Sequence, residues 1–70
     1  MQDVQKKLGK RIAELRKKGG FSQEGFAHEC GFHRSYMGAV ERGEKNITIQ
    51  MVNRVAKALK MSLSELLKGV

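Results

Sequence analysis

Few side chains in this 70-residue sequence have both the types and the spacing that a chemical site requires. His28, Cys30 and His33 are metal-ligand types, but residues two apart on a helix are rotated by about 200° around its axis. His28 and Cys30 would therefore face apart, and Cys30 suits a small core position better. The sequence shows no paired carboxylates, no nucleophile with a base and no glycine-rich phosphate loop. We therefore expect no metal, no cofactor and no enzymatic activity.

The charge balance favours a polyanionic partner. Fourteen Lys and Arg stand against seven Asp and Glu, a formal net charge of +7. Such a surplus suits nucleic acid or an anionic membrane surface. One cysteine excludes an intrachain disulfide, and the apolar runs are too short for a membrane span or a signal peptide. We therefore expect a cytoplasmic protein that forms one small domain over residues 1–70.

Any functional side chains must be positioned by helices, because the chain has no proline and its apolar residues recur with the helical period. A Ser or Thr cap precedes the second, fourth and fifth expected helices, and glycine follows the first three. The expected helices cover residues 3–18, 23–30, 34–42, 49–60 and 63–67. The expected core consists of Val4, Leu8, Ile12, Leu15, Phe21, Phe26, Ala27, Cys30, Phe32, Met37, Val40, Val52, Val55, Ala56 and Leu59.

The stretch Gln23–Arg42 has the most demanding spacing in the chain. It is expected to form a helix, a tight turn and a second helix. Ala27 lies where two helices that cross at about 90–120° need a small side chain. Gly31 suits a left-handed turn, and Met37 and Val40 complete the shared core. This pattern resembles the helix-turn-helix of the lambda repressor and Cro family. The flanking stretches LRKKGGFSQEGFA, GFHRSYMGAVERGEKN and VNRVAKALKMSLSELL are similar to that family in order and spacing.

The resemblance implies an all-α, compact five-helix DNA-binding domain with its helix-turn-helix at about residues 22–42. It also implies a sequence-specific regulator that places the helix 34–42 in the major groove of double-stranded DNA. Arg34 is the best candidate for base reading, because its guanidinium pairs bidentately with guanine. The alternative is that Arg34 only neutralises phosphate. The residues implied at base edges are Arg34, Ser35, Tyr36 and Ala39.

Phosphate contacts are implied on both sides of the helix 34–42. Gln23 is a favoured phosphate contact, because it starts the preceding helix, whose positive end attracts an anion. Capping is the simpler role for Ser22, and a solvated loop is the alternative for Lys45 and Asn46. His33 stands where the family usually has Ser, Thr or Asp. Here it is expected to act as a weaker helix cap or to contact phosphate. The full implied set is Ser22, Gln23, His33, Arg42, Lys45 and Asn46.

Two further features follow from the resemblance. Arg16 and Glu41 match an ion pair that ties the reading helix to the scaffold in several family members. A homodimer on an inverted-repeat operator is implied, since one reading helix covers too few base pairs. We expect its interface to be carboxy-terminal, with burial inside the monomer as the alternative. The expected interface residues are Leu63, Leu66, Leu67 and Val70.

The run HRSYMGAVERGEKNITI is also similar to the controller proteins of restriction-modification systems, which bind operators upstream of their own genes. An antitoxin-like or other protein-interaction module with a DNA-binding domain stays open. Glu24 matches an acidic position that some family activators present to RNA polymerase. Polymerase is therefore a second candidate partner, although a solvated glutamate at a helix start is the simpler interpretation.

Two other partners have less support. Residues 1–20 hold seven basic and two acidic residues, whereas residues 21–48 hold three basic and four acidic ones. The helix-turn-helix, the expected reading head, is therefore not the most basic part of the chain, which keeps partners other than DNA open. Residues 3–18 could lie on anionic lipid with their lysines outward, but their apolar stripe is narrow and has no aromatic anchor. Single-stranded RNA requires exposed aromatics, and only Tyr36 lies outside the expected core. We therefore expect no membrane partner.

Overall fold

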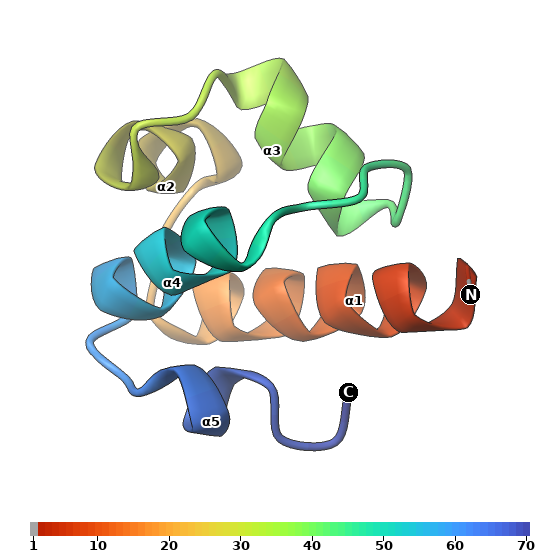
Figure 1. Cartoon of the computed structure of the whole chain (residues 1–70). Coiled ribbons are helices and arrows are strands. Elements are labelled where there is room, and N and C mark those ends of the chain that lie inside the picture. Colours follow the sequence, from red (N-terminus) through yellow and green to blue (C-terminus); the bar gives the residue numbers. More distant parts are fainter. Residues whose placement is uncertain (1) are drawn as a thin grey trace.

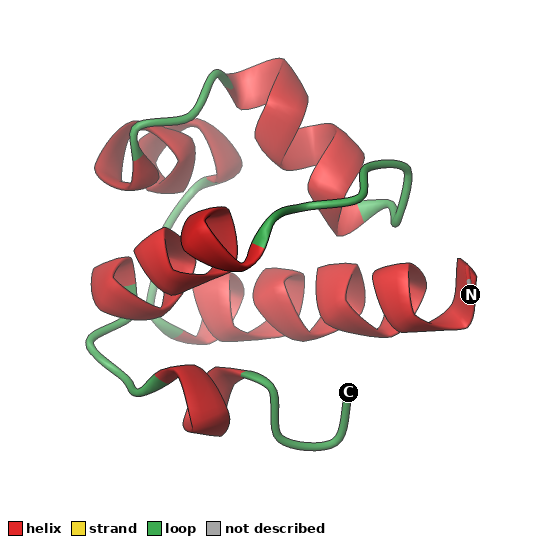
Figure 2. Cartoon of the chain, in the orientation of Figure 1, coloured by secondary structure: helices red, strands yellow, loops and turns green. Residues whose placement is uncertain are grey.

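Five helices and their connecting loops make up the part of the chain that the structure, a computed structural model, describes: residues 2–70, with side chains from residue 4 onward. The helices are α1 (Gln2–Lys18), α2 (Gln23–Cys30), α3 (Arg34–Glu41), α4 (Ile49–Ala58) and α5 (Leu63–Leu66). Figure 2 shows that short loops join them, and no strand occurs within residues 2–70. The expected all-α, five-helix architecture is confirmed.

The helices begin where their capping residues predict. The hydroxyls of Ser22, Thr48 and Ser62 each accept a hydrogen bond from the backbone N–H three residues later, at 3.0, 3.2 and 3.1 Å. Each hydroxyl satisfies one of the N–H groups that lack a partner in the first turn of a helix. His33 caps α3 with its ring, because Nδ1 accepts from the N–H of Ser35 at 3.1 Å.

The long helix α1 lies through the middle of the molecule, with α2 and α3 on one side and α5 on the other (Figure 1). Its inward residue Ile12 is fully buried. The largest fully buried side chains are Phe26, Ile12, Met37, Leu66, Val40 and Val55. Most of the expected core is therefore confirmed. Val4 is the exception, because 57% of it is exposed near the start of α1, and Leu15, Phe21 and Leu59 are only partly buried.

The backbones of α1 and α3 approach closely at Gly9. A Cβ at this position would lie 2.7 Å from the carbonyl oxygen of Glu41 and would also overlap the carbonyl oxygen of Val40. Glycine inside a helix costs about 1 kcal/mol relative to alanine. Here that cost is offset because the missing side chain lets α1 support the end of α3.

The carboxy-terminal part is held by α1. Arg11 donates from Nε to the carbonyl oxygen of Leu66 at 3.1 Å and from Nη2 to that of Glu65 at 2.9 Å. These carbonyls belong to the last turn of α5, where intrahelical donors run out. A single turn such as α5 is therefore fixed by its packing and by Arg11. No helix within residues 2–70 combines the length and apolarity needed to cross a membrane.

Candidate nucleic-acid interface

The turn between α2 and α3 has the geometry that its sequence predicts. Gly31 has φ 76°, in the left-handed region, and its N–H donates to the carbonyl oxygen of His28 at 3.1 Å. The N–H of Phe32 donates to the carbonyl oxygen of Ala27 at 2.8 Å. Ala27 is 1% exposed, so its small side chain is what allows the helices to meet. The helix-turn-helix geometry expected for residues 22–42 is therefore present.

The start of α3 presents the side chains expected to read bases. Arg34 and Ser35 are exposed, and Tyr36 is half-buried with its ring edge-on to Phe32 at a centroid distance of 5.1 Å. Ser35 Oγ lies 2.7 Å from His33 Nδ1, so the cap of α3 also engages this hydroxyl. Arg34 is therefore the side chain with the greatest freedom to reach outward from the helix start.

The middle of α3 faces inward. Ala39 is only 7% exposed, which leaves its methyl group little surface for a thymine methyl, and it stays the weakest of the expected base contacts. Gly38 is also buried, and a Cβ there would lie 3.1 Å from Arg42 Nη1 and 3.4 Å from Gln23 Oε1. A side chain at position 38 would therefore require the ends of Arg42 and Gln23 to shift by a few tenths of an ångström.

A buried polar network fixes α3 to α1 and α2. Arg16 donates to Glu41 through Nε at 2.7 Å and Nη2 at 3.1 Å, and its Nη1 donates to the carbonyl oxygen of Phe21 at 3.0 Å. Gln23 Nε2 donates to Glu41 Oε1 at 3.1 Å. The Arg16 and Glu41 side chains are only 10% and 8% exposed. The structure thus joins the expected pair, and adds Gln23, which sequence reasoning had assigned to phosphate alone.

The loop after α3 carries the remaining expected phosphate contacts. Arg42, Lys45 and Asn46 are all exposed. Arg42 donates to Glu44 through Nε and Nη2, both at 3.1 Å, and both side chains are more than half exposed. The hydrogen bond from Arg42 lowers the pKa of the Glu44 carboxyl. Sequence reasoning missed Glu44, since a spacing of two residues does not by itself predict an ion pair.

The comparisons with known proteins fit this geometry. A helix-turn-helix family model matches residues 12–66. The chain belongs to the helix-turn-helix family. Control protein C.SmaI of Serratia marcescens is 38% identical over 65 residues, which span 93% of this chain and 77% of that protein. Control protein C.BamHI of Bacillus amyloliquefaciens is 34% identical over 61 residues, or 86% and 75%.

A solved structure gives the same result. The restriction-modification controller protein C.AhdI from Aeromonas hydrophila superposes with a TM-score of 0.88 at 40% identity, and the match covers 93% of this chain and 94% of that one. The resemblance to the lambda repressor and Cro family is therefore confirmed. Restriction-modification controllers are among the relatives of this helix-turn-helix protein.

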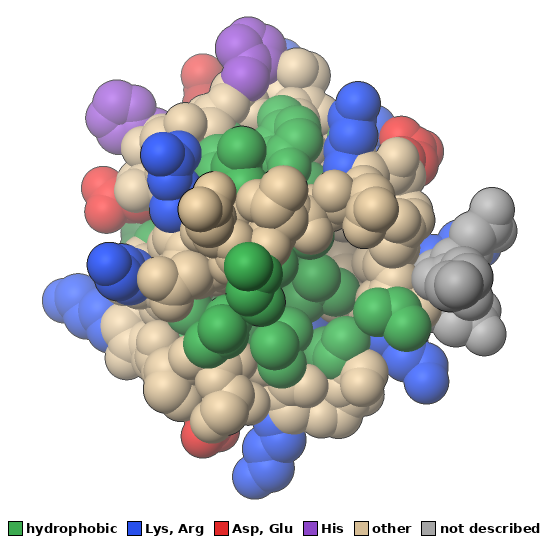
Figure 3. All heavy atoms as spheres, viewed as in Figure 1, with side chains coloured by type: hydrophobic (Ala, Val, Ile, Leu, Met, Phe, Trp, Pro, Cys, Tyr) green, Lys and Arg blue, Asp and Glu red, His purple; other side chains and the backbone are tan. Residues whose placement is uncertain are grey.

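The expected dimer residues need one correction. Leu66 is fully buried in the monomer core, so it has no surface to offer a second copy. Leu63, Leu67 and Val70 are partly buried and pack against the edge of that core. Ile49, which sequence reasoning missed, is 60% exposed at the start of α4. Figure 3 shows hydrophobic side chains gathered on the face over α4 and α5.

Cys30 belongs to the core of this helix-turn-helix protein. The residue is 5% exposed, and burial raises the pKa of its thiol to about 11, with a smaller contribution from Glu29. Its thiol is therefore protonated at neutral pH. Among the side chains of residues 4–70, no three His, Cys, Asp or Glu gather closely enough to hold a metal ion.

Proposed function

We propose that this chain is a sequence-specific transcriptional regulator that reads double-stranded DNA with α3 in the major groove. The observation that carries the proposal is Arg34, exposed at the first position of a helix whose other end is locked by Arg16 and Glu41. A guanidinium presented from a rigid helix suits bidentate pairing with guanine. The family to which the chain belongs supports this assignment.

In this arrangement Arg34, Ser35 and Tyr36 reach base edges and Ala39 makes at most a small apolar contact. The phosphates flanking the groove are bound from α2 by Ser22 and Gln23 and from the other side by the Arg42–Asn46 loop, with His33 beside the reading helix. Gln23 has a double role, because its amide nitrogen already binds Glu41. Gln23 therefore links the proposed phosphate contact to the buried network of Arg16 and Glu41.

We further propose that two copies bind an inverted repeat upstream of their own gene, as a controller of a restriction-modification system. The apolar residues available to join them are Ile49, Leu63, Leu67 and Val70. The names of the relatives support the controller role. Glu24, exposed in the first turn of α2, is the proposed contact to RNA polymerase if the regulator activates.

Nuclease footprinting on the DNA upstream of the gene tests this function. We expect protection of two half-sites whose centres are separated by about 10 base pairs, one turn of DNA. The control is the same experiment on unrelated upstream DNA. Equal protection of both DNAs, without a defined site, would contradict sequence-specific regulation.

A matched pair of variants separates base reading from phosphate binding. Arg34→Ala is expected to cost about 1 to 3 kcal/mol on the protected operator and little on random duplex, because the lost contact is to a base. The measurement is fluorescence anisotropy with both DNAs. Equal losses on the two DNAs would show that Arg34 contacts phosphate only.

Lys45→Ala is the counterpart. We expect it to weaken binding to both DNAs alike and to reduce the slope of log affinity against log salt by about 0.9, the value for one phosphate contact. The same anisotropy titrations at several salt concentrations supply the slope. A slope equal to that of the unaltered protein would remove Lys45 from the interface.

A further inference from the structure

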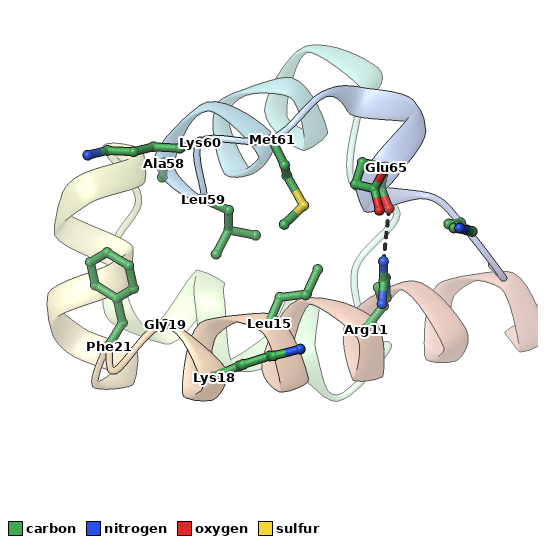
Figure 4. Close-up of a pocket in the computed structure, with 11 residues that line it drawn as sticks. Arg11, Leu15, Lys18, Gly19, Phe21, Ala58, Leu59, Lys60, Met61 and Glu65 are labelled. Atoms are coloured by element: carbon green, nitrogen blue, oxygen red, sulfur yellow. Dashed lines mark hydrogen bonds between the residues drawn. The ribbon is translucent and has the colours of Figure 1, made fainter.

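A groove separates α1 from the segment that joins α4 to α5, and it encloses about 770 Å³ (Figure 4). None of its lining residues belongs to α2 or α3, so it lies apart from the helix-turn-helix. Its apolar floor is formed by Leu15, Phe21, Leu59 and Met61, which are all partly buried. Figure 4 shows Leu15 of α1 pointing toward Leu59 and Met61 across the groove.

The floor is fixed by the core beneath it. The ring of Phe21 packs on the fully buried Phe26 at a centroid distance of 5.1 Å, tilted by 51°. The N–H of Met61 donates to the carbonyl oxygen of Ala56 at 3.0 Å, which sets the turn after α4. The groove is therefore formed before any partner arrives, so little ordering is required on binding.

Basic side chains line the rim. A second hollow borders the groove and extends along α1, and Arg11 and Lys68 line both. Together the two hollows are lined by six basic residues against the acidic residues Glu14 and Glu65. The basic residues are Lys7, Lys10, Arg11, Lys18, Lys60 and Lys68. Part of the positive charge of residues 1–20, which the reading head does not use, is therefore concentrated beside an apolar floor.

Lys60 adds an independent observation. It has φ 58°, the one non-glycine residue with positive φ in the part of the chain that the structure describes. Four glycines take this left-handed conformation at other turns, where they avoid the clash of a Cβ with the following carbonyl. A lysine at this helix end therefore adopts a conformation that its backbone disfavours, and it lines the groove.

We propose that this groove binds an acidic amphipathic segment of a partner protein. As a helix, this segment presents apolar residues at positions i, i+3 or i+4, and i+7 to the floor of the groove. Its carboxylates then face the lysines of the rim. The cations line the groove and the neighbouring hollow instead of converging on one point, which suits an elongated helical segment better than a small anion. A lipid surface is flat and would require protruding apolar side chains, whereas these line a concavity.

The first test uses a synthetic 14-residue peptide with leucines at helical spacing and glutamates elsewhere. Titration of the full ¹⁵N-labelled chain should move the NMR amide signals of groove residues, with those of α3 unchanged. The charge-reversal variant Lys18→Glu/Lys60→Glu should weaken binding about fivefold or more, because exposed ion pairs each contribute modestly. Lys17→Glu/Lys57→Glu is the matched control, since these exposed lysines lie on α1 and α4, close in sequence to Lys18 and Lys60 but outside the groove.

A second variant separates binding from folding. Lys60→Gly relieves the left-handed strain and should raise Tm by about 4 °C, as expected for a strained non-glycine residue in a domain of this size. The same variant should bind the peptide about twofold to fivefold more weakly, because it removes one rim charge. A purely structural role for Lys60 predicts no change in peptide affinity, and that result would remove it from the proposed site.

Three outcomes would overturn the proposal. One is an equal loss of peptide affinity in the groove and control variants, which would mean that net charge alone drives binding. Another is equal affinity for a peptide of the same composition whose leucines do not share one helical face. The third is a response of the groove signals to duplex DNA or to phosphatidylglycerol vesicles with none to the peptide.

Discussion

At the scale of single residues, Glu44 places a negative charge among the side chains proposed to bind phosphate. Its carboxylate accepts from Nε and Nη2 of Arg42 in the free protein, so a phosphate at Arg42 competes with Glu44 or uses the remaining N–H groups of the guanidinium. Because its negative charge repels phosphate, we expect Glu44 to lower the affinity for any DNA, random duplex included.

Glu44→Gln is expected to raise affinity for random duplex DNA about twofold to fivefold at low salt, an effect the size of one exposed ion pair. Added salt should shrink the gain, because exposed charges are screened. Anisotropy titrations at two salt concentrations measure both quantities. Glu14→Gln makes the same change in net charge on α1 and is the control. An equal gain in this control would assign the effect to net charge.

Which residue roles could be predicted from the sequence depends on how local their causes are. The Ser22 cap and the Gly31 turn follow from backbone conformations set by neighbours, so their spacing predicts them. The resemblance to the family supplied the pair of Arg16 and Glu41. The engagement of Gln23 by Glu41 could not be predicted, because it depends on where α2 sits against α3.

At the scale of helices, the network of Arg16 and Glu41 holds α3 in its orientation. Arg16→Ala or Glu41→Ala should each destabilise the fold by about 3 kcal/mol, since each leaves a buried charge without its partner. The double variant should recover part of the loss, which makes the two effects non-additive. Urea denaturation of the four proteins measures this coupling.

The exposed pair Arg42 and Glu44 supplies the control cycle for that experiment. Its coupling should stay below about 1 kcal/mol, because water screens both partners. Where an alanine variant fails to fold, Glu41→Gln and Arg16→Lys give a milder cycle. Simple additivity in the Arg16 and Glu41 cycle would show that the two side chains contribute separately.

Helix positions could be predicted more closely than helix faces. Caps and glycines fix the ends, so the observed bounds of α2 match and α3 ends one residue before its expected end. The apolar period places Val4 on the inner stripe, yet α1 extends past the helices that would cover it. Periodicity identifies a face, but only the lengths of neighbouring helices decide how far that face is buried.

At the scale of the whole molecule, the apolar face over α4 and α5 is the proposed dimer surface. Sedimentation at micromolar concentration should report about twice the chain mass of 7.9 kDa. Leu67→Glu and Ile49→Glu should each give a folded monomer with weak operator binding, because a buried carboxylate opposes association. Ile49 is the cleaner position, since it is 60% exposed in the monomer.

Gln50→Glu is the matched control for this prediction, because it adds the same charge on an exposed neighbouring residue. It should remain dimeric. A wild-type protein that sediments as a monomer and protects a single half-site at saturation would contradict the dimer. The sequence alone could not sort these leucines, because the full burial of Leu66 and the partial burial of Leu67 depend on how one short turn rests on α1.

The close approach of α1 and α3 at Gly9 also limits how this chain can change by mutation. Every other amino acid adds a Cβ, which would overlap the carbonyl oxygens of Val40 and Glu41. Every substitution at position 9 is therefore expected to destabilise the fold, even to alanine, which is the better helix former. A random library over α1 should lose variants at Gly9 as completely as at Ile12, while Lys17 accepts most replacements.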